Sequence, residues 1–225
     1  MDIDISQIDH RNVDIPEYIG FVTKKLENHI ALVKNKAYKK LAFTPSNKNN
    51  FKNFFEEIVP LMFFLKTQKD NYNKIKYMAG SQKGDALLDG KTIIEITKAQ
   101  NEQYYFLNQD MLNHGYAFSP KNIQKTAGNS SPTKTQPYVH RNKEHVSDVA
   151  EYIFKSIERK QKKNYPRNSI LLISFDSDTL LLECDGDYSH LEQEITKYEK
   201  GIFSTIYIVE NFITNNLQPK WQFVL

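Results

Sequence analysis

The sequence predicts an α/β fold, with a mixed central β-sheet flanked by helices and a helical segment at the N-terminus. Two observations predict this class. The run Ser169 to Phe175 (SILLISF) is apolar almost throughout, which is typical of a strand buried on both faces of a sheet. Stretches with apolar residues at helical spacing alternate along the chain with short strand-like runs, which favours helices packed on a sheet.

The chain opens with a long predicted helix. Asp14 and Pro16 suit an N-cap and a first helical turn, and apolar residues continue at helical spacing as far as Leu41. A Thr-Pro-Ser break follows. We therefore expect residues 1–46 to form a helical arm packed on a core of residues 47–225.

A second helix is predicted from Phe51 to Phe63, where large apolar residues recur at positions i, i+3, i+4 and i+7. Pro60 should kink this helix, because proline removes a backbone donor from it. The pattern then changes from helical to strand-like. We predict strands at residues 74–78, 85–88 and 92–97.

The second half of the chain continues with alternating elements. Helices are predicted at residues 100–114, 144–163 and 188–198, and strands at residues 169–175, 180–182, 205–209 and 221–225. The stretch 116–142 is polar and contains several prolines, so we predict a long loop there. Helices, then three strands, then helices alternating with strands make up the order of an α/β sandwich.

The composition limits what the protein can be. The net charge is +3, and Cys184 is the single cysteine, so the chain forms no internal disulfide. No apolar run approaches the roughly 18 residues that a membrane span needs, and no secretory leader is evident. The chain has no glycine-rich phosphate loop, which argues against nucleotide hydrolysis. We expect a cytoplasmic protein that does not enter a membrane.

The register of the hairpin between residues 85 and 97 decides whether Asp85 and Glu95 share a face of the sheet. If the turn has two residues, Asp85 lies opposite Ile94, and Glu95 points to the other face. If the loop has three residues, Asp85 lies opposite Ile93 and on the face of Glu95. We predict an odd-numbered loop, which also turns Ile94 and Ile96 towards the core.

The stretch Gly84 to Gln100 (GDALLDGKTIIEITKAQ) resembles the core motif of the PD-(D/E)XK, or restriction-endonuclease-like, nucleases. In that motif an acid on one strand is followed, after a hairpin, by (D/E)-x-K on the next strand. The resemblance implies that Asp85 and Glu95 bind Mg²⁺ or Mn²⁺, with the carbonyl of Ile96 as a further ligand. It also implies hydrolysis of phosphodiester bonds, on DNA rather than RNA, by an endonuclease of restriction, defence or toxin type.

The sequence departs from this motif where the lysine is expected. Thr97 stands in that position, and Lys98 comes next, on the opposite face unless the strand ends or bulges there. Gln100 lies where it could reach the attacking water or a phosphate. Glu56, on the flank of the preceding apolar stripe, fits an accessory metal-binding acid, whereas Glu57 points further from that stripe.

Basic residues near the long loop and at one helix end predict contacts with a nucleic acid, since Lys and Arg neutralise phosphates regardless of base sequence. The candidates are His140, Arg141, Lys143, Arg159 and Lys163. We expect a basic concavity beside Asp85, and a homodimer is a further candidate assembly.

Three other interpretations stay open. The acids of the hairpin can simply form a solvated face. The chain can be a catalytically inactive nucleic-acid-binding or immunity-type protein with the same fold, or a module that binds only proteins. Metal binding at Asp85 and Glu95 separates the nuclease from the inactive protein, and affinity for nucleic acid at low salt separates both from the protein-binding module.

Overall fold

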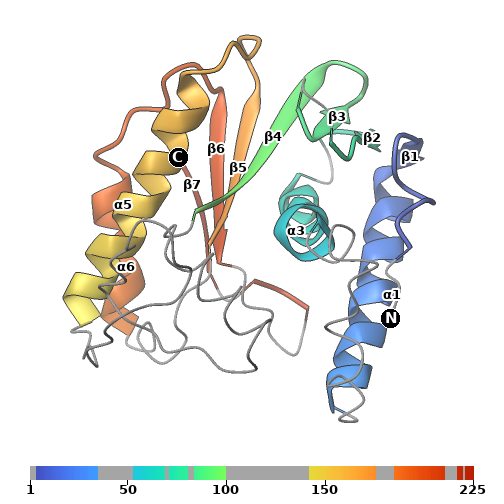
Figure 1. The fold of residues 1–225 in the computed structure, drawn as a ribbon, viewed down its shortest axis with the longest axis horizontal. Coiled ribbons are helices and arrows are strands. Elements are labelled where there is room, and N and C mark those ends of the chain that lie inside the picture. The colour runs from blue at the N-terminus through green and yellow to red at the C-terminus, as the bar shows by residue number, and fades with distance from the viewer. Residues whose placement is uncertain are drawn as a thin grey trace, which may run out of the picture.

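The computed structural model describes residues 4–34, 53–68, 71–80, 84–99, 142–175, 185–210, 217–219 and 221–225. In these ranges the chain forms one seven-stranded mixed sheet with helices on both of its faces (Figure 1). The predicted α/β class is confirmed. The elements expected at residues 100–114, 116–142 and 180–182, and the boundary at residue 46, lie outside the described ranges.

The strands follow one another across the sheet in the order of the sequence. They are β1 (Asn12–Asp14), β2 (Lys74–Tyr77), β3 (Ala86–Leu88), β4 (Thr92–Ala99), β5 (Ile170–Phe175), β6 (Thr205–Glu210) and β7 (Gln222–Val224). Strands β1, β2, β3 and β4 pair with one another antiparallel. Strands β4, β5 and β6 pair parallel, and β7 is an edge strand antiparallel to β6. Parallel neighbours need a crossover connection. Helices α5 (Asn142–Gln161) and α6 (Asp185–Ile195) lie in the two crossovers.

Two apolar cores cover the two faces of the sheet. On one face lie α1 (Ile15–Lys34), the π-helical turn η3 (Phe54–Ile58) and α3 (Val59–Thr67), and on the other lie α5 and α6 (Figure 1). Strand β5 is buried along its whole length. Its residues alternate between the two cores, with Leu172 in the first and Ile173 in the second. This is the strand that the run SILLISF predicts.

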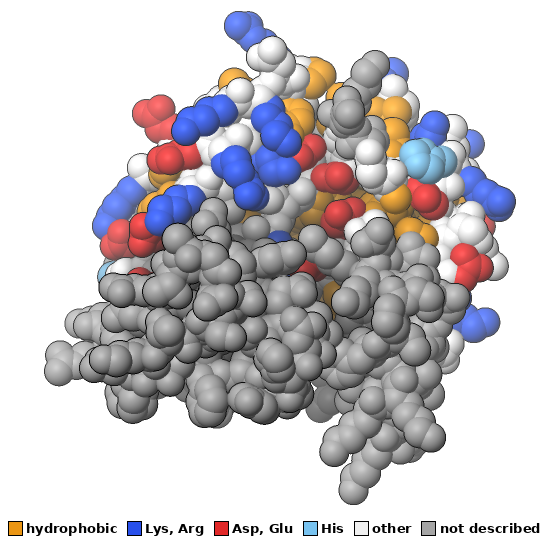
Figure 2. Space-filling model, in the orientation of Figure 1, with side chains coloured by type: hydrophobic (Ala, Val, Ile, Leu, Met, Phe, Trp, Pro, Cys, Tyr) orange, Lys and Arg blue, Asp and Glu red, His pale blue; other side chains and the backbone are white. Residues whose placement is uncertain are grey.

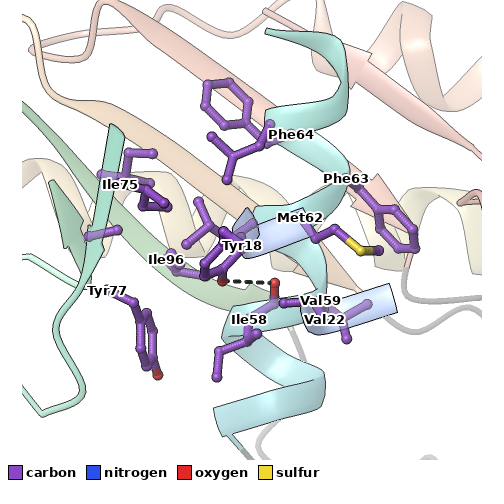
Figure 3. Close-up of a cluster of buried hydrophobic side chains, with 14 of the residues drawn as sticks. Tyr18, Val22, Ile58, Val59, Met62, Phe63, Phe64, Ile75, Tyr77 and Ile96 are labelled. Carbon is purple, nitrogen blue, oxygen red and sulfur yellow. Dashed lines mark hydrogen bonds between the residues drawn. The ribbon is translucent and has the colours of Figure 1, made fainter. Parts of the chain in front are cut away.

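Figure 3 shows the first core, where α1 and α3 meet the sheet. The buried hydroxyl of Tyr18 donates to the carbonyl of Ile58 at 3.3 Å. Large side chains of α3, including Phe63 and Phe64, fill the space between α1 and the strands. In the described part of the chain, no helix is long and apolar enough to cross a membrane.

A π-helical turn stands directly before Pro60, where a kink was expected. The N–H of Val59 donates to the carbonyl of Phe54, five residues earlier. Pro60 has no N–H with which to bond the carbonyl of Glu56, as an α-helix would require. The hydroxyl of Ser174 donates to that carbonyl at 3.4 Å instead. Pro60 thus lies in the first turn of α3, and the sheet satisfies a carbonyl of the turn before it.

Strand β1 was not predicted from the sequence. It is only three residues long, and Val13 alone in it is buried. Its pairing with β2 is extended by the N–H of His10, which donates to the carbonyl of Tyr77 at 2.8 Å. The N-terminal segment therefore contributes an edge strand as well as the helix α1.

Candidate active site

The hairpin between β3 and β4 closes with a three-residue loop. Leu88 pairs with Thr92, which leaves residues 89–91 in the loop. Asp89 and Gly90 both have positive φ angles, +47° and +68°. The carboxylate of Asp89 accepts the backbone N–H of Lys74 at 2.7 Å, which holds the start of the loop against β2. The predicted odd-numbered loop is confirmed, although it begins one residue later than expected.

This register places Asp85 and Glu95 on the same side of the hairpin. Ala86 pairs with Ile94, so Asp85 comes next to Glu95 rather than opposite Ile93. Ile94 and Ile96 point into the first core, as predicted.

Glu95 and Thr97 point to the face that α5 covers. They are only 6% and 7% exposed. The interpretation of this face as simply solvated is therefore wrong for Glu95 and Thr97, because both are buried beneath a helix.

The carboxylate of Asp85 accepts a hydrogen bond from the backbone of β4 at a position where β3 has not yet begun. Strand β3 begins only at Ala86, and an Asp85 oxygen accepts the backbone N–H of Ile96 at 2.7 Å. The preceding Gly84 has a φ of +116°, and a Cβ there would lie 2.5 Å from a methyl carbon of Ile93. Only glycine fits this position without strain, so Gly84 allows the backbone to bring Asp85 to the edge of β4.

The environment of Asp85 disfavours its negative charge. The pKa of this carboxyl is raised to about 7, first by burial and also by the nearby carboxylates of Glu95 and Glu57, against the opposing effects of the Ile96 N–H and Lys160. Burial and neighbouring acids destabilise an ionised carboxylate by removing solvation and adding repulsion. A cation placed between these acids would relieve that repulsion.

The sequence favoured Glu56 over Glu57 as the accessory acid, because Glu57 was expected to point further from the apolar stripe. In the structure, Glu57 is the residue of η3 whose charge affects Asp85. It accepts a hydrogen bond from the hydroxyl of Tyr77 at 2.6 Å, and its charge raises the pKa of Asp85. Glu56 instead lies 3.5 Å from the ammonium of Lys98. The predicted phase assumed α-helical geometry, whereas residues 54–58 form a π-helical turn with a different rotation per residue.

Helix α5 brings two cations to the face of Glu95 and Thr97. The ammonium of Lys160 forms a buried ion pair with Glu95. The guanidinium of Arg159 donates to the hydroxyl of Thr97 at 2.9 Å. A hydrogen bond with Glu95 contributes, after burial, to raising the pKa of Tyr165 above its usual range. Glu95 and Thr97 thus meet positive charge from a segment more than sixty positions later in the chain.

Lys160 was not singled out from the sequence as a site residue, although its position in the helix indicates that it is buried. It follows Ile153 and Ile157 at the i, i+4, i+7 spacing of a buried helix stripe. Both isoleucines are fully buried, and Lys160 is buried with them. A lysine on the apolar stripe of a helix needs a partner there, and that partner is Glu95.

The remaining predicted site residues are not all brought together. Lys98 points to the face opposite Glu95, as strand alternation predicts, and lies beside Glu56. Lys143 lies near the start of α5, about 24 Å along the helix axis from Arg159 at 1.5 Å per residue. Gln100, His140 and Arg141 lie outside the described residues.

Exposed basic residues continue past the end of α5. Besides Arg159 they are Lys162, Lys163 and Arg167. On the face drawn in Figure 2, Lys and Arg side chains gather in the upper left, over this end of the helix, with acidic side chains beside them.

The carboxylates suit a hard divalent cation of the Mg²⁺ type, which proteins commonly hold with one or two carboxylates while water and substrate complete its shell. Asp85 and Glu95 supply two carboxylates here, and Glu95 is already paired with the ammonium of Lys160. Over the described residues, no group of three or more His, Cys, Asp or Glu side chains is arranged to hold an ion. The candidate donors at this position are the two carboxylates of Asp85 and Glu95.

Comparison with models of protein families, with curated proteins and with solved structures finds no match to this chain. Its class therefore rests on the fold and on the chemistry at the hairpin. Together these define an α/β protein in which Glu95 and Thr97 of a strand hairpin meet cations from a crossover helix.

Proposed function

We propose that this protein is a metal-dependent nuclease that hydrolyses phosphodiester bonds, with DNA as its substrate. The observation that carries the proposal is the convergence of Asp85 and Glu95 on one side of the hairpin, with Glu57 close enough to affect Asp85. A carboxyl whose pKa is raised by burial and by neighbouring acids is typical of a functional site. DNA is preferred over RNA because of the family that the hairpin motif resembles.

The arrangement of strands supports the same proposal. An antiparallel meander of β2, β3 and β4 is followed by α5 and a parallel β5. This agrees with the layout implied by the resemblance to PD-(D/E)XK nucleases, in which the acid and the (D/E)-x-K segment occupy neighbouring strands. Fold alone does not define an activity, so the proposal depends on the residues of the hairpin.

Asp85 and Glu95 would hold Mg²⁺ or Mn²⁺. When bound, the ion would supply charge stabilisation at the phosphate and a more acidic water. In the hydrolysis, a water oxygen forms a bond to phosphorus while the bond from phosphorus to one ester oxygen breaks. The water releases a proton to solvent and the departing oxygen takes one up. Glu57, held by the hydroxyl of Tyr77, adds to the negative charge that retains the cation.

The direct test is cleavage of plasmid and single-stranded DNA by the purified chain with Mg²⁺, with Mn²⁺ and with a chelator. Asp85→Ala is the control, because it removes a proposed ligand. We expect cleavage by the wild type only with metal, and none by the variant. Equal trace cleavage by the wild type and Asp85→Ala would assign the activity to a contaminant and reject the proposal.

A second candidate is a catalytically inactive nucleic-acid-binding or immunity-type protein. The observation that favours it is the neutralisation of Glu95 by Lys160, with Thr97 in place of the motif lysine. This candidate predicts DNA binding that weakens with added salt, no cleavage, and no change on adding Mn²⁺.

A further inference from the structure

We propose that Lys160, on helix α5, supplies the positive charge that the hairpin lacks at Thr97, and that its ammonium contacts the scissile phosphate beside Glu95. The inference rests on the proposed nuclease function. It assigns to a helix, more than sixty residues after the hairpin, a role that the order of residues in the hairpin does not reveal.

The first support is the burial of the ion pair. The side chains of Lys160 and Glu95 are only 11% and 8% exposed. Removing two charges from water costs several kcal/mol per ion, and their attraction often fails to offset that cost. The buried pair of Lys160 and Glu95 is therefore not explained by stability alone. It holds an ammonium group in a fixed position next to a site that receives an anion.

The second support is the exclusion of the two nearer candidates. Thr97 has a short, neutral side chain, and its hydroxyl accepts a hydrogen bond from Arg159. Lys98 lies on the other face of the sheet, beside Glu56. Among these candidates, Lys160 is the lysine that lies on the same face as Glu95.

The third support is the balance of charge. The ammonium of Lys160 already pairs with Glu95, which the hairpin register places next to Asp85. A phosphate brings further negative charge to this position. Preorganised cations aimed at charge that develops in the transition state give a large part of enzymatic rate acceleration, and Lys160 is fixed in place before substrate binds.

The test uses Lys160→Met, which keeps the apolar stem of the side chain and removes its charge. Thr97→Lys/Lys160→Met returns an ammonium to the same face from the strand. Lys155→Ala is the matched control, because Lys155 is an exposed lysine of the same helix whose partner is Glu151 at 2.6 Å. For each variant we would measure the rate of DNA cleavage with Mg²⁺ and the shift in unfolding temperature on adding Mn²⁺.

We expect Lys160→Met to cleave about 100-fold more slowly than wild type, and the double variant to recover at least about tenfold. Lys160→Met should still be stabilised by Mn²⁺, by at least as much as wild type, because a competing positive charge next to Glu95 is gone. Lys155→Ala should match the wild type in both measurements.

Cleavage by Lys160→Met at the wild-type rate would overturn the assignment and leave the nuclease proposal standing. A slow variant that Mn²⁺ no longer stabilises, and that Thr97→Lys does not rescue, would show a structural role for Lys160 and would also overturn it. If the wild type neither cleaves nor responds to Mn²⁺ while Lys160→Met gains the response, Lys160 occupies the place of a metal. That result rejects the nuclease proposal and the inference together.

Discussion

The two faces of strand β4 differ in chemistry although their residues alternate along the same segment. Ile94 and Ile96 join an apolar core beneath α1 and α3. Glu95 and Thr97 lie beneath α5 and meet the cations of Lys160 and Arg159. Both faces are buried, so burial alone does not explain the charges on the second. Paired charges in a buried position cost stability that apolar residues would not, which is why we place the function on the α5 face.

Of the substitutions that test the difference between the two faces of β4, Glu95→Gln should have the largest effect on cleavage. The substitution keeps the shape of the side chain and removes a charge from a proposed ligand of a hard cation. We expect metal-dependent cleavage to fall by about 1000-fold or more, while folding and DNA binding persist. The measurements are cleavage with Mg²⁺, circular dichroism and a DNA-binding titration. Cleavage at the wild-type rate would show that Glu95 is not a ligand.

The neighbouring position on the apolar face should respond in the opposite way. Ile94→Ala removes three buried methyl or methylene carbons from the first core, and such changes typically lower the free energy of unfolding by about 3 kcal/mol. Because Ile94 points away from Asp85 and Glu95, the folded variant should keep its rate of cleavage at low temperature. Denaturant unfolding and a cleavage assay on the same sample test both parts. A loss of cleavage without a loss of stability would contradict the separation of the two faces.

The free energy of unfolding should depend on pH because the pKa of Asp85 differs between the folded and the unfolded protein. The pKa of Asp85 is raised from 3.8 to about 7, so its protonated form is favoured in the folded state. The stability that this group contributes is fully present below pH 3.8 and is lost as the pH rises through 7. Between about pH 5 and pH 8, the free energy of unfolding should fall by about 2 kcal/mol more in the wild type than in Asp85→Asn.

The measurement is urea unfolding of both proteins in the presence of a chelator, since a bound cation would itself lower the pKa of Asp85. The asparagine side chain of the variant keeps an oxygen that can accept the N–H of Ile96 and has no charge to titrate. Parallel pH profiles for the two proteins would show that Asp85 does not carry the dependence.

The smallest effect is expected on the face opposite Glu95, at Lys98. Its ion pair with Glu56 is partly exposed, so Lys98→Ala should lower the free energy of unfolding by no more than about 1 kcal/mol. It should slow cleavage far less than Lys160→Met does. If Lys98→Ala is the more damaging of the two, the end of β4 turns Lys98 towards the substrate, and the assignment of the charge to Lys160 is wrong.

The sequence by itself determined the α/β class and the buried strand β5, and it limited the hairpin to two registers, of which one places Asp85 and Glu95 on the same face. Each of these depends on local rules. An unbroken apolar run predicts burial on both faces, and the alternation of side chains along a strand makes the parity of a loop decide which residues share a face. The structure has the odd-numbered loop that was predicted, but the loop begins at Asp89, one residue later than expected.

The groups that surround Asp85 and Glu95 were decided only by the tertiary structure. Strand β1 forms because β2 offers it an edge, not because three residues of modest apolar character favour a strand. Glu57 acts on Asp85 in place of Glu56 because residues 54–58 adopt a π-helical turn before Pro60. Lys160 reaches Glu95 across 65 positions of sequence. Such pairings depend on how α5 packs over the sheet, and no local pattern of spacing records which strand residue a helix will cover.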